Sequence, residues 1–125
     1  MANKNASVSA RSSARSIVAK WTGLGNGDIG VGPAGNSNLQ MPSYPDRTVQ
    51  VLGTFGTGGS ISIEGSNDGT TWVVLSDPLG NALTFTAAGL KQITEMPDMI
   101  RPHGTAGDGT TSLSVYLAAR GTINP

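Results

Sequence analysis

Cysteine is absent from the 125 residues. Its absence excludes disulfide bonds, thiolate catalysis and cysteine-ligated zinc sites. Charged residues are scarce at 13%, about half of the usual share, and the formal net charge is zero. This composition lacks the basic excess of a nucleic-acid-binding domain, so we expect no nucleic-acid partner.

Long apolar runs are missing as well. No stretch approaches the roughly 20 residues that span a bilayer, and the N-terminal residues lack the hydrophobic segment of a signal peptide. We therefore expect no membrane partner. We also expect a protein that is made in a cytoplasm and used there or in something assembled there.

Glycine and proline, in contrast, are abundant. Together the 18 glycines and 7 prolines form a fifth of the chain, against roughly 12% in average usage. They separate short bursts of Leu, Ile, Val and Thr, which is typical of β-sandwiches and barrels. The sequence predicts an all-β fold, an antiparallel, jelly-roll-like β-sandwich of seven or eight short strands.

Charge is unevenly distributed along the chain. The four charged residues before Asp28 are all basic, so residues 1–27 carry +4 and residues 28–125 carry −4. Residues 2–16 are too polar to form a core, and residues 23–38 are rich in glycine, with a short extended piece at 29–31. We therefore predict an extended N-terminal arm and glycine-rich loop over residues 1–45 and a β-sandwich domain over residues 46–125.

Alternating apolar residues mark the strands. Further strands are predicted at 16–22, 48–55, 83–86 and 90–95. The last one, over 112–120, turns one face of apolar side chains inward: Leu113, Val115, Leu117 and Ala119. A strand over 99–102 is doubtful in the interior of a sheet, because Pro102 cannot donate a ladder hydrogen bond.

The most secure element is a β-hairpin over residues 60–76. Ile61 and Ile63 alternate with polar residues, and the turn at 66–69 reads Ser-Asn-Asp-Gly, which favours a tight reversal. The returning strand, 71–75, is apolar on both faces. It predicts a core role for Trp72, with a sugar-stacking platform as the alternative, and it suggests association of copies as dimers or trimers.

The sequence contains no complete catalytic motif. The chain has one histidine, His103, and no serine lies in a nucleophile-elbow motif that could serve as its catalytic partner. His103 is therefore interpreted as a surface or edge residue. The glycine-rich stretch 53–59 is followed by a strand, whereas a phosphate-binding loop needs a helix. Glu64 and Glu95 lack any sign of a sugar cleft. We therefore expect no enzyme.

Five of the six aspartates lie mostly in glycine-rich turns, where carboxylates can gather around calcium: Asp28, Asp68, Asp77, Asp98 and Asp108. No stretch has the alternating acids of an EF-hand loop. Turn chemistry explains each of these five aspartates, so we expect no metal and no cofactor.

The body contains four segments in a fixed order, residues 49–56, 60–72, 77–83 and 100–102, followed by the Gly107-Asp108-Gly109 loop and a terminal strand. This succession resembles small virion proteins of tailed bacteriophages, the head decoration or stabilisation (cement) proteins. The resemblance covers roughly residues 46–120.

The resemblance implies a structural protein on the capsid exterior that stabilises the particle by binding major capsid protein subunits. In this interpretation the basic arm lies along the capsid, and the candidate contact residues are Lys4, Arg11, Arg15, Lys20 and Trp21. The turn over residues 65–72 also looks like discoidin-type and other carbohydrate-binding sandwiches. The alternative function is therefore a tail- or fibre-associated carbohydrate-binding module.

Overall fold

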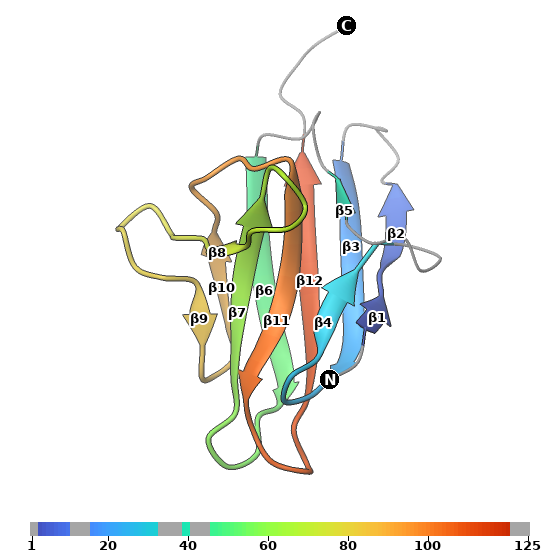
Figure 1. Cartoon of the computed structure of the whole chain (residues 1–125), viewed down its shortest axis with the longest axis vertical. Helices are drawn as coiled ribbons and strands as arrows, with labels where there is room; N and C mark the ends of the chain where they lie inside the picture. The colour runs from blue at the N-terminus through green and yellow to red at the C-terminus, as the bar shows by residue number, and fades with distance from the viewer. Residues whose placement is uncertain (1–2, 11–15, 33–38, 41–45, 121–125) are drawn as a thin grey trace, which may run out of the picture.

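The computed structural model describes residues 3–10, 16–32, 39–40 and 46–120, which form two sheets packed face to face (Figure 1). Sheet A has the order β1-β4-β11-β7-β8, with β5 pairing β11 and β9 pairing β7. Its strands are β1 (Asn3–Asn5), β4 (Ile29–Val31), β5 (Leu39–Gln40), β7 (Ser60–Ser66), β8 (Val73–Val74), β9 (Thr84–Phe85) and β11 (Met99–Ala106).

Sheet B has the order β10-β6-β12-β3-β2. Its strands are β2 (Ser7–Ala10), β3 (Ser16–Leu24), β6 (Asp46–Thr54), β10 (Gly89–Gln92) and β12 (Ser112–Arg120). All strand pairs are antiparallel except β1 with β4. No helix in the described part of the chain is long and apolar enough to cross a membrane.

The connectivity confirms the jelly-roll prediction. The chain passes repeatedly from one sheet to the other, so that β10, β6, β12 and β3 lie side by side, opposite β4, β11, β7 and the β8/β9 position. These eight positions are the two interleaved Greek keys of a jelly roll. The described residues add β1, β2 and β5 to this scaffold, and the strand count is therefore twelve rather than seven or eight.

The core lies between the sheets and follows the predicted alternation. Along β12, Leu113, Val115, Leu117 and Ala119 are buried, while the residues between them are partly exposed. A strand turns alternate side chains to opposite faces, so this pattern gives each sheet one apolar face. The largest fully buried side chains are Trp21, Leu24, Ile61, Ile63, Leu83, Ile100, Leu113 and Leu117.

The hairpin predicted over residues 60–76 is confirmed, with Glu64 opposite Val74 and Gly65 opposite Val73. Its turn is held by Asp68, whose Oδ1 accepts hydrogen bonds from the backbone N–H groups of Thr70 at 2.8 Å and Thr71 at 2.7 Å. The returning strand is only two residues long, and both of its valines are exposed. The expectation that residues 71–75 are buried on both faces is therefore wrong.

The N-terminal segment differs from the predicted arm. In the described residues of 1–45, β3 lies inside sheet B between β12 and β2, and β4 lies inside sheet A between β11 and β1. β3 pairs with β12 from Ser16 to Leu24. The alternation of Ile17, Ala19 and Trp21 explains this position, because it gives β3 an apolar face for the core.

Pro102 lies within β11, an inner strand of sheet A, so the doubt about an interior strand was wrong. Gly104 exchanges backbone hydrogen bonds with the β4 side, donating to Asp28 at 2.8 Å and accepting from Gly27 at 2.8 Å. Since N–H directions alternate along a strand, the nitrogen of Pro102 points to the same side and away from β7. On that side, Met99 and Ile100 pair with β5 and His103 pairs with β4. Pro102 lies between these two pairings, so its missing N–H costs no ladder hydrogen bond.

Candidate functional site

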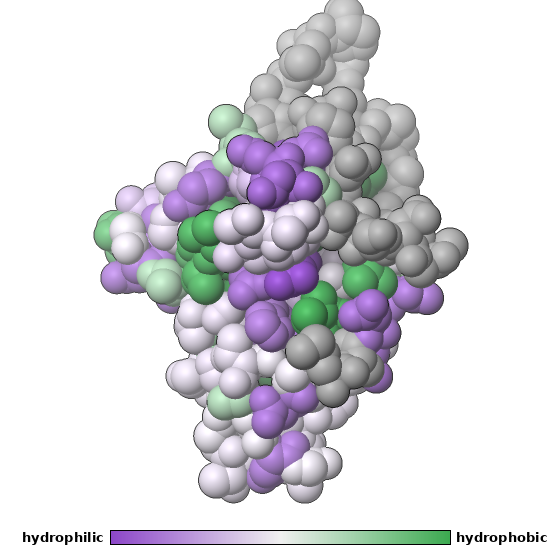
Figure 2. All heavy atoms as spheres, viewed as in Figure 1, coloured by the Kyte–Doolittle hydropathy of each residue, from purple (hydrophilic) through white to green (hydrophobic). Residues whose placement is uncertain are grey.

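The outer face of sheet A carries a cluster of polar contacts that comes from two neighbouring strands, β7 and β11. Alternation turns Ser60, Ser62 and Glu64 of β7 outward, and the antiparallel register sets Arg101 opposite Glu64 and His103 opposite Ser62. Figure 2 views this face: hydrophilic groups run along its middle, with hydrophobic groups over β8 on one side and over β4 on the other.

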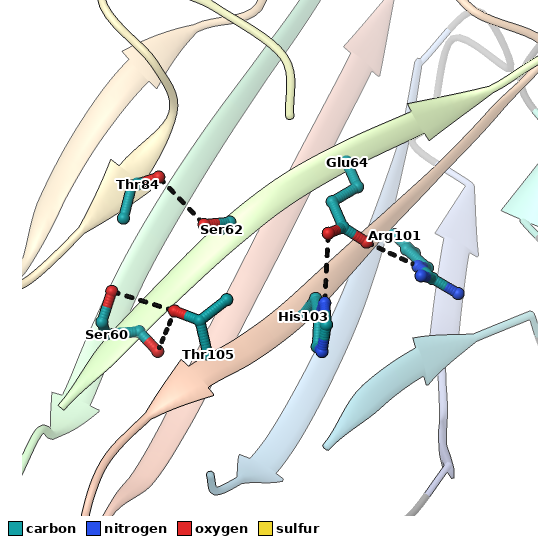
Figure 3. A network of polar contacts seen from close by, with 7 residues as sticks. All are labelled: Ser60, Ser62, Glu64, Thr84, Arg101, His103 and Thr105. Atoms are coloured by element: carbon teal, nitrogen blue, oxygen red, sulfur yellow. Dashed lines mark hydrogen bonds and ion pairs between the residues drawn. The ribbon is translucent and has the colours of Figure 1, made fainter. Parts of the chain in front are cut away.

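Glu64 is the centre of this cluster (Figure 3). Its Oε1 accepts a hydrogen bond from Arg101 Nε at 2.8 Å, and its Oε2 lies 3.1 Å from His103 Nδ1. Only 9% of Glu64 is exposed, so its charge needs these partners, because an unpaired buried carboxylate is costly. The arrangement fixes the Arg101 guanidinium and the His103 imidazole on the face of the sheet.

Trp72 packs on the same cluster. The Arg101 guanidinium lies over the indole, 4.1 Å from the ring centroid, in a cation–π contact. Trp72 is only partly buried and does not belong to the hydrophobic core. The predicted core role of Trp72 is therefore wrong: the returning strand turns this side chain to the outer face, where Arg101 is its partner.

Hydroxyl groups continue the polar face. Ser62 Oγ and Thr84 Oγ1 are 2.9 Å apart, and Thr105 Oγ1 donates to the carbonyl or the side chain of Ser60, at 3.3 and 3.1 Å (Figure 3). The sequence indicated Ser60, Ser62 and Glu64 as outward-facing. The role of Arg101 was not predicted. Because Pro102 argued against an interior strand, the alternation of Arg101, His103 and Thr105 along that strand was not recognised.

Ser62, His103 and Glu64 are the residue types of a hydrolytic triad, and the contact of His103 Nδ1 with a carboxylate matches the orienting half of one. The nucleophile half does not match. The Ser62 hydroxyl is paired with Thr84 rather than with the imidazole. The arrangement therefore favours binding over acyl transfer.

Two other carboxylates, those of Asp68 and Asp108, stabilise turns. Asp108 accepts from the Thr110 hydroxyl at 2.7 Å and from the N–H of Thr57 at 2.9 Å, and these bonds hold its pKa well below the usual range. Bonds from the N–H groups of Thr71 and Thr70 do the same for the pKa of Asp68. Among the described residues, no group of three or more His, Cys, Asp or Glu side chains is placed to hold a metal.

Glu64 and Glu95 do not act as a pair of glycosidase acids. Glu95 accepts hydrogen bonds from the backbone N–H and the hydroxyl of Ser76, while Glu64 bonds to Arg101 and His103. The glycine-rich stretch 53–59 leads from β6 into β7, which confirms the strand predicted after it.

Three of the five candidate contact residues lie in the described part of the chain, and each has different surroundings. Trp21 is 1% exposed, and its indole N–H donates to the Val31 carbonyl at 2.9 Å, so its assignment as a contact residue is corrected. Lys4 Nζ lies 4.0 Å from Asp28 Oδ2 in sheet A, and Lys20 Nζ lies 5.2 Å from the Tyr116 ring centroid in sheet B. Arg11 and Arg15 lie outside the described residues.

Exposed apolar side chains gather at one edge of the sandwich. Of the six large hydrophobic residues exposed in the described part of the chain, five belong to residues 73–96, which form β8, β9, β10 and their connections. We call this set the apolar edge: Val73, Val74, Leu79, Leu90 and Met96. The apolar pattern at 71–75 suggested association of copies, but the sequence did not predict that Leu79, Leu90 and Met96 would be exposed at the same edge.

A shallow cavity of about 370 Å³ lies in the apolar edge. Val73, Val74 and Met96 line it, together with Pro97 and Glu95. The charges at this edge are already engaged: Lys91 Nζ lies 3.8 Å from Asp77 Oδ2, and Glu95 is bonded to Ser76. The charged groups of the edge thus already have partners, and Glu95 is the one carboxylate in the lining of the cavity.

No family model matches this sequence, and no curated protein matches it significantly. Among solved structures, the chain is similar to the SPBc2 prophage-derived protein YomS, with a TM-score of 0.54 and 10% identity over 83% of this chain and 93% of that one. It is also similar to the cupin domain of Schizosaccharomyces pombe Cnp3 (TM-score 0.45, 8% identity, 93% and 59% covered). A third similar structure is the CBM32 of AlyQ in complex with 4,5-unsaturated mannuronic acid (TM-score 0.45, 16% identity, 81% and 76% covered). At these identities the likeness to YomS shows the fold.

Proposed function

We propose that this chain is a non-enzymatic virion structural protein that binds and stabilises the capsid of a tailed bacteriophage. It would be made in the host cytoplasm and bound to major capsid protein subunits on the capsid exterior. The observation that carries the proposal is the apolar edge on a rigid jelly roll. A prophage-derived protein with the same fold is consistent with this origin.

The apolar edge has the properties of a docking surface. Val73 and Met96 are 62% and 66% exposed, so covering them removes apolar surface from water at about 25 cal/mol per Å². Val73, Val74 and Met96 line one cavity, and contiguous exposed apolar groups commonly mark interaction sites. Self-association as dimers or trimers belongs to the same proposal, because an apolar edge can also join copies around a capsid symmetry axis.

The experiment compares particles assembled with the wild-type protein, with the double variant Val73→Asp/Met96→Asp, and with the control Leu52→Asp. Leu52 is 37% exposed but lies on the outer face of sheet B. Deleting residues 2–20 would not test capsid binding by the N-terminal segment, because the deletion removes β1, β2 and part of β3 and so disturbs both sheets.

We expect the double variant to bind particles at least tenfold more weakly and to lose the gain in heat resistance, while the control binds as the wild type does. Circular dichroism checks that both variants are folded, and averaged images of the particles give occupancy and stoichiometry. Full occupancy by the double variant would contradict the proposal, as would an equal loss in the control.

A further inference from the structure

We propose that the outer face of sheet A also carries a binding site for a neutral saccharide, built on Trp72, Arg101 and His103. This site goes beyond capsid attachment, since it lies on a face of the sandwich and uses different side chains from Val73 and Met96. Three features of the face support it: an aromatic platform, a rigid frame and a row of fixed polar groups.

Trp72 supplies the platform. Its ring is partly exposed although the Arg101 guanidinium covers it at 4.1 Å from the centroid. An aromatic face is electron-rich and attracts groups with partial positive charge, such as the C–H groups on one side of a sugar ring. Arg101 is in turn held by Glu64 at 2.8 Å. The guanidinium that packs on the indole is thus fixed by an ion pair.

The loop that presents Trp72 is held in place before any ligand binds. Asp68 accepts hydrogen bonds from the N–H groups of Thr70 and Thr71 and from the Ser66 hydroxyl at 2.9 Å. Asn67 Oδ1 accepts from the Asp98 N–H at 2.8 Å, which ties the loop to the start of β11. Preorganisation of this kind lowers the entropic cost of binding.

Polar groups extend from the platform along β11. His103 and Thr105 follow Arg101 on the same face, and the four residue steps from Arg101 to Thr105 span about 13 Å of strand, enough for more than one sugar ring. The Nε2 of His103 takes no part in the contact with Glu64. Imidazole, hydroxyl and guanidinium groups can exchange hydrogen bonds with sugar hydroxyls.

The charges of the face select a neutral ligand. Arg101 is paired with Glu64, so its positive charge is already compensated. An anionic sugar would have to compete with Glu64 for the guanidinium, whereas a neutral sugar needs only hydrogen-bond partners. Trp and Arg are also common in the centres of protein interfaces, so a protein partner is the rival occupant that the experiment must distinguish.

The test titrates the full chain with neutral gluco- and manno-oligosaccharides, and in parallel with an oligouronate, up to about 10 mM, a range that detects even weak binding. The readout is the NMR signal of each indole N–H. We expect the Trp72 signal to shift with the neutral sugars and the signal of buried Trp21 to stay in place. For the variants, binding is followed through the backbone amide signals of residues 101–105. Trp72→Ala should weaken binding at least tenfold, whereas Tyr116→Ala, an aromatic control on sheet B, should leave it unchanged.

Failure of every neutral sugar to shift the Trp72 signal would overturn the proposal, as would an equal loss in Tyr116→Ala or tighter binding of the uronate. If Trp72→Ala lowers capsid occupancy while no sugar binds, the face belongs to a protein partner and the saccharide site is rejected. Capsid binding itself is tested separately through Val73 and Met96, so the two proposals can fail independently.

Discussion

Trp21 lies between the two sheets, and its indole N–H donates to the Val31 carbonyl at 2.9 Å. Trp72 lies on the outer face of sheet A, where Arg101 is its principal partner. The two residues have the same side chain but different energetic roles. Burial of a whole indole stabilises the fold through packing, whereas a partly exposed indole over a cation contributes roughly 0.5–2 kcal/mol.

We predict that Trp21→Ala lowers the free energy of unfolding by about 3–5 kcal/mol, because it leaves a large cavity. Trp72→Ala should lower the same free energy by less than about 2 kcal/mol, since only the contact with Arg101 and partial burial are lost. Urea unfolding followed by circular dichroism measures both. Equal losses in the two variants would show that Trp72 belongs to the core after all.

Among the elements, β4 and β11 depend on a close approach at Gly30. A Cβ atom at Gly30 would lie 2.5 Å from Cδ of Pro102 and 2.7 Å from Nε1 of Trp21. Glycine therefore lets β4 pass close to the proline ring of β11 and to the Trp21 indole of β3. Pro102 is tolerated in an inner strand for two reasons: its nitrogen points away from β7, and its ring is accommodated beside Gly30.

Gly30→Ala is predicted to destabilise the protein by about 1–3 kcal/mol, because the added methyl group overpacks this crossing point. Gly109→Ala is the matched control: a Cβ atom there meets nothing within 4 Å, and we expect a change within about 0.5 kcal/mol. Thermal and urea unfolding of the two variants measure the difference. If Gly30→Ala leaves the free energy of unfolding unchanged, β4 can move away from Pro102.

For the whole molecule, the opposite charges of the two parts of the sequence are combined in a single body. Residues 1–27 carry +4 and the remainder −4, yet β1 pairs with β4 and β3 pairs with β12. Lys4 lies beside Asp28, 4.0 Å away. The described part of the segment that looked like a basic arm therefore supplies strands to both sheets, and its Lys4 meets Asp28 within the fold.

Several carboxylates in the loops make the stability of the protein depend on pH. Hydrogen bonds to Asp68, Asp77 and Asp108 hold their pKa values below the ordinary range. The folded-state pKa of each is thus lower than its unfolded value of about 4. Their contribution is fully present above that value and is lost as the pH falls toward the folded-state pKa.

We therefore predict that the midpoint of thermal unfolding is constant near neutral pH and decreases steadily below about pH 4. In Asp68→Asn/Asp108→Asn the midpoint should be lower than that of the wild type at pH 7, and the difference should shrink at pH 3. Calorimetry across this range measures both quantities. A difference that stays constant with pH would show that these two carboxylates do not cause the acid sensitivity.

The sequence by itself determined the all-β class, the jelly-roll-like sandwich, the hairpin at residues 60–76 and the inward face of β12. These features depend on period-two alternation and on turn residues such as Asp68, which act over a few neighbouring positions. Even within this local range, the two-sided apolar pattern at 71–75 was ambiguous, because alternation cannot tell which face is covered.

Only the tertiary structure decided which strands pair and what covers each face. It placed β3 and β4 inside the sheets, buried Trp21, exposed Val73 and brought Arg101 between Glu64 and Trp72. Glu64 and Arg101 are 37 residues apart in the chain. Contacts of this kind depend on the register between distant strands, which local propensity does not specify.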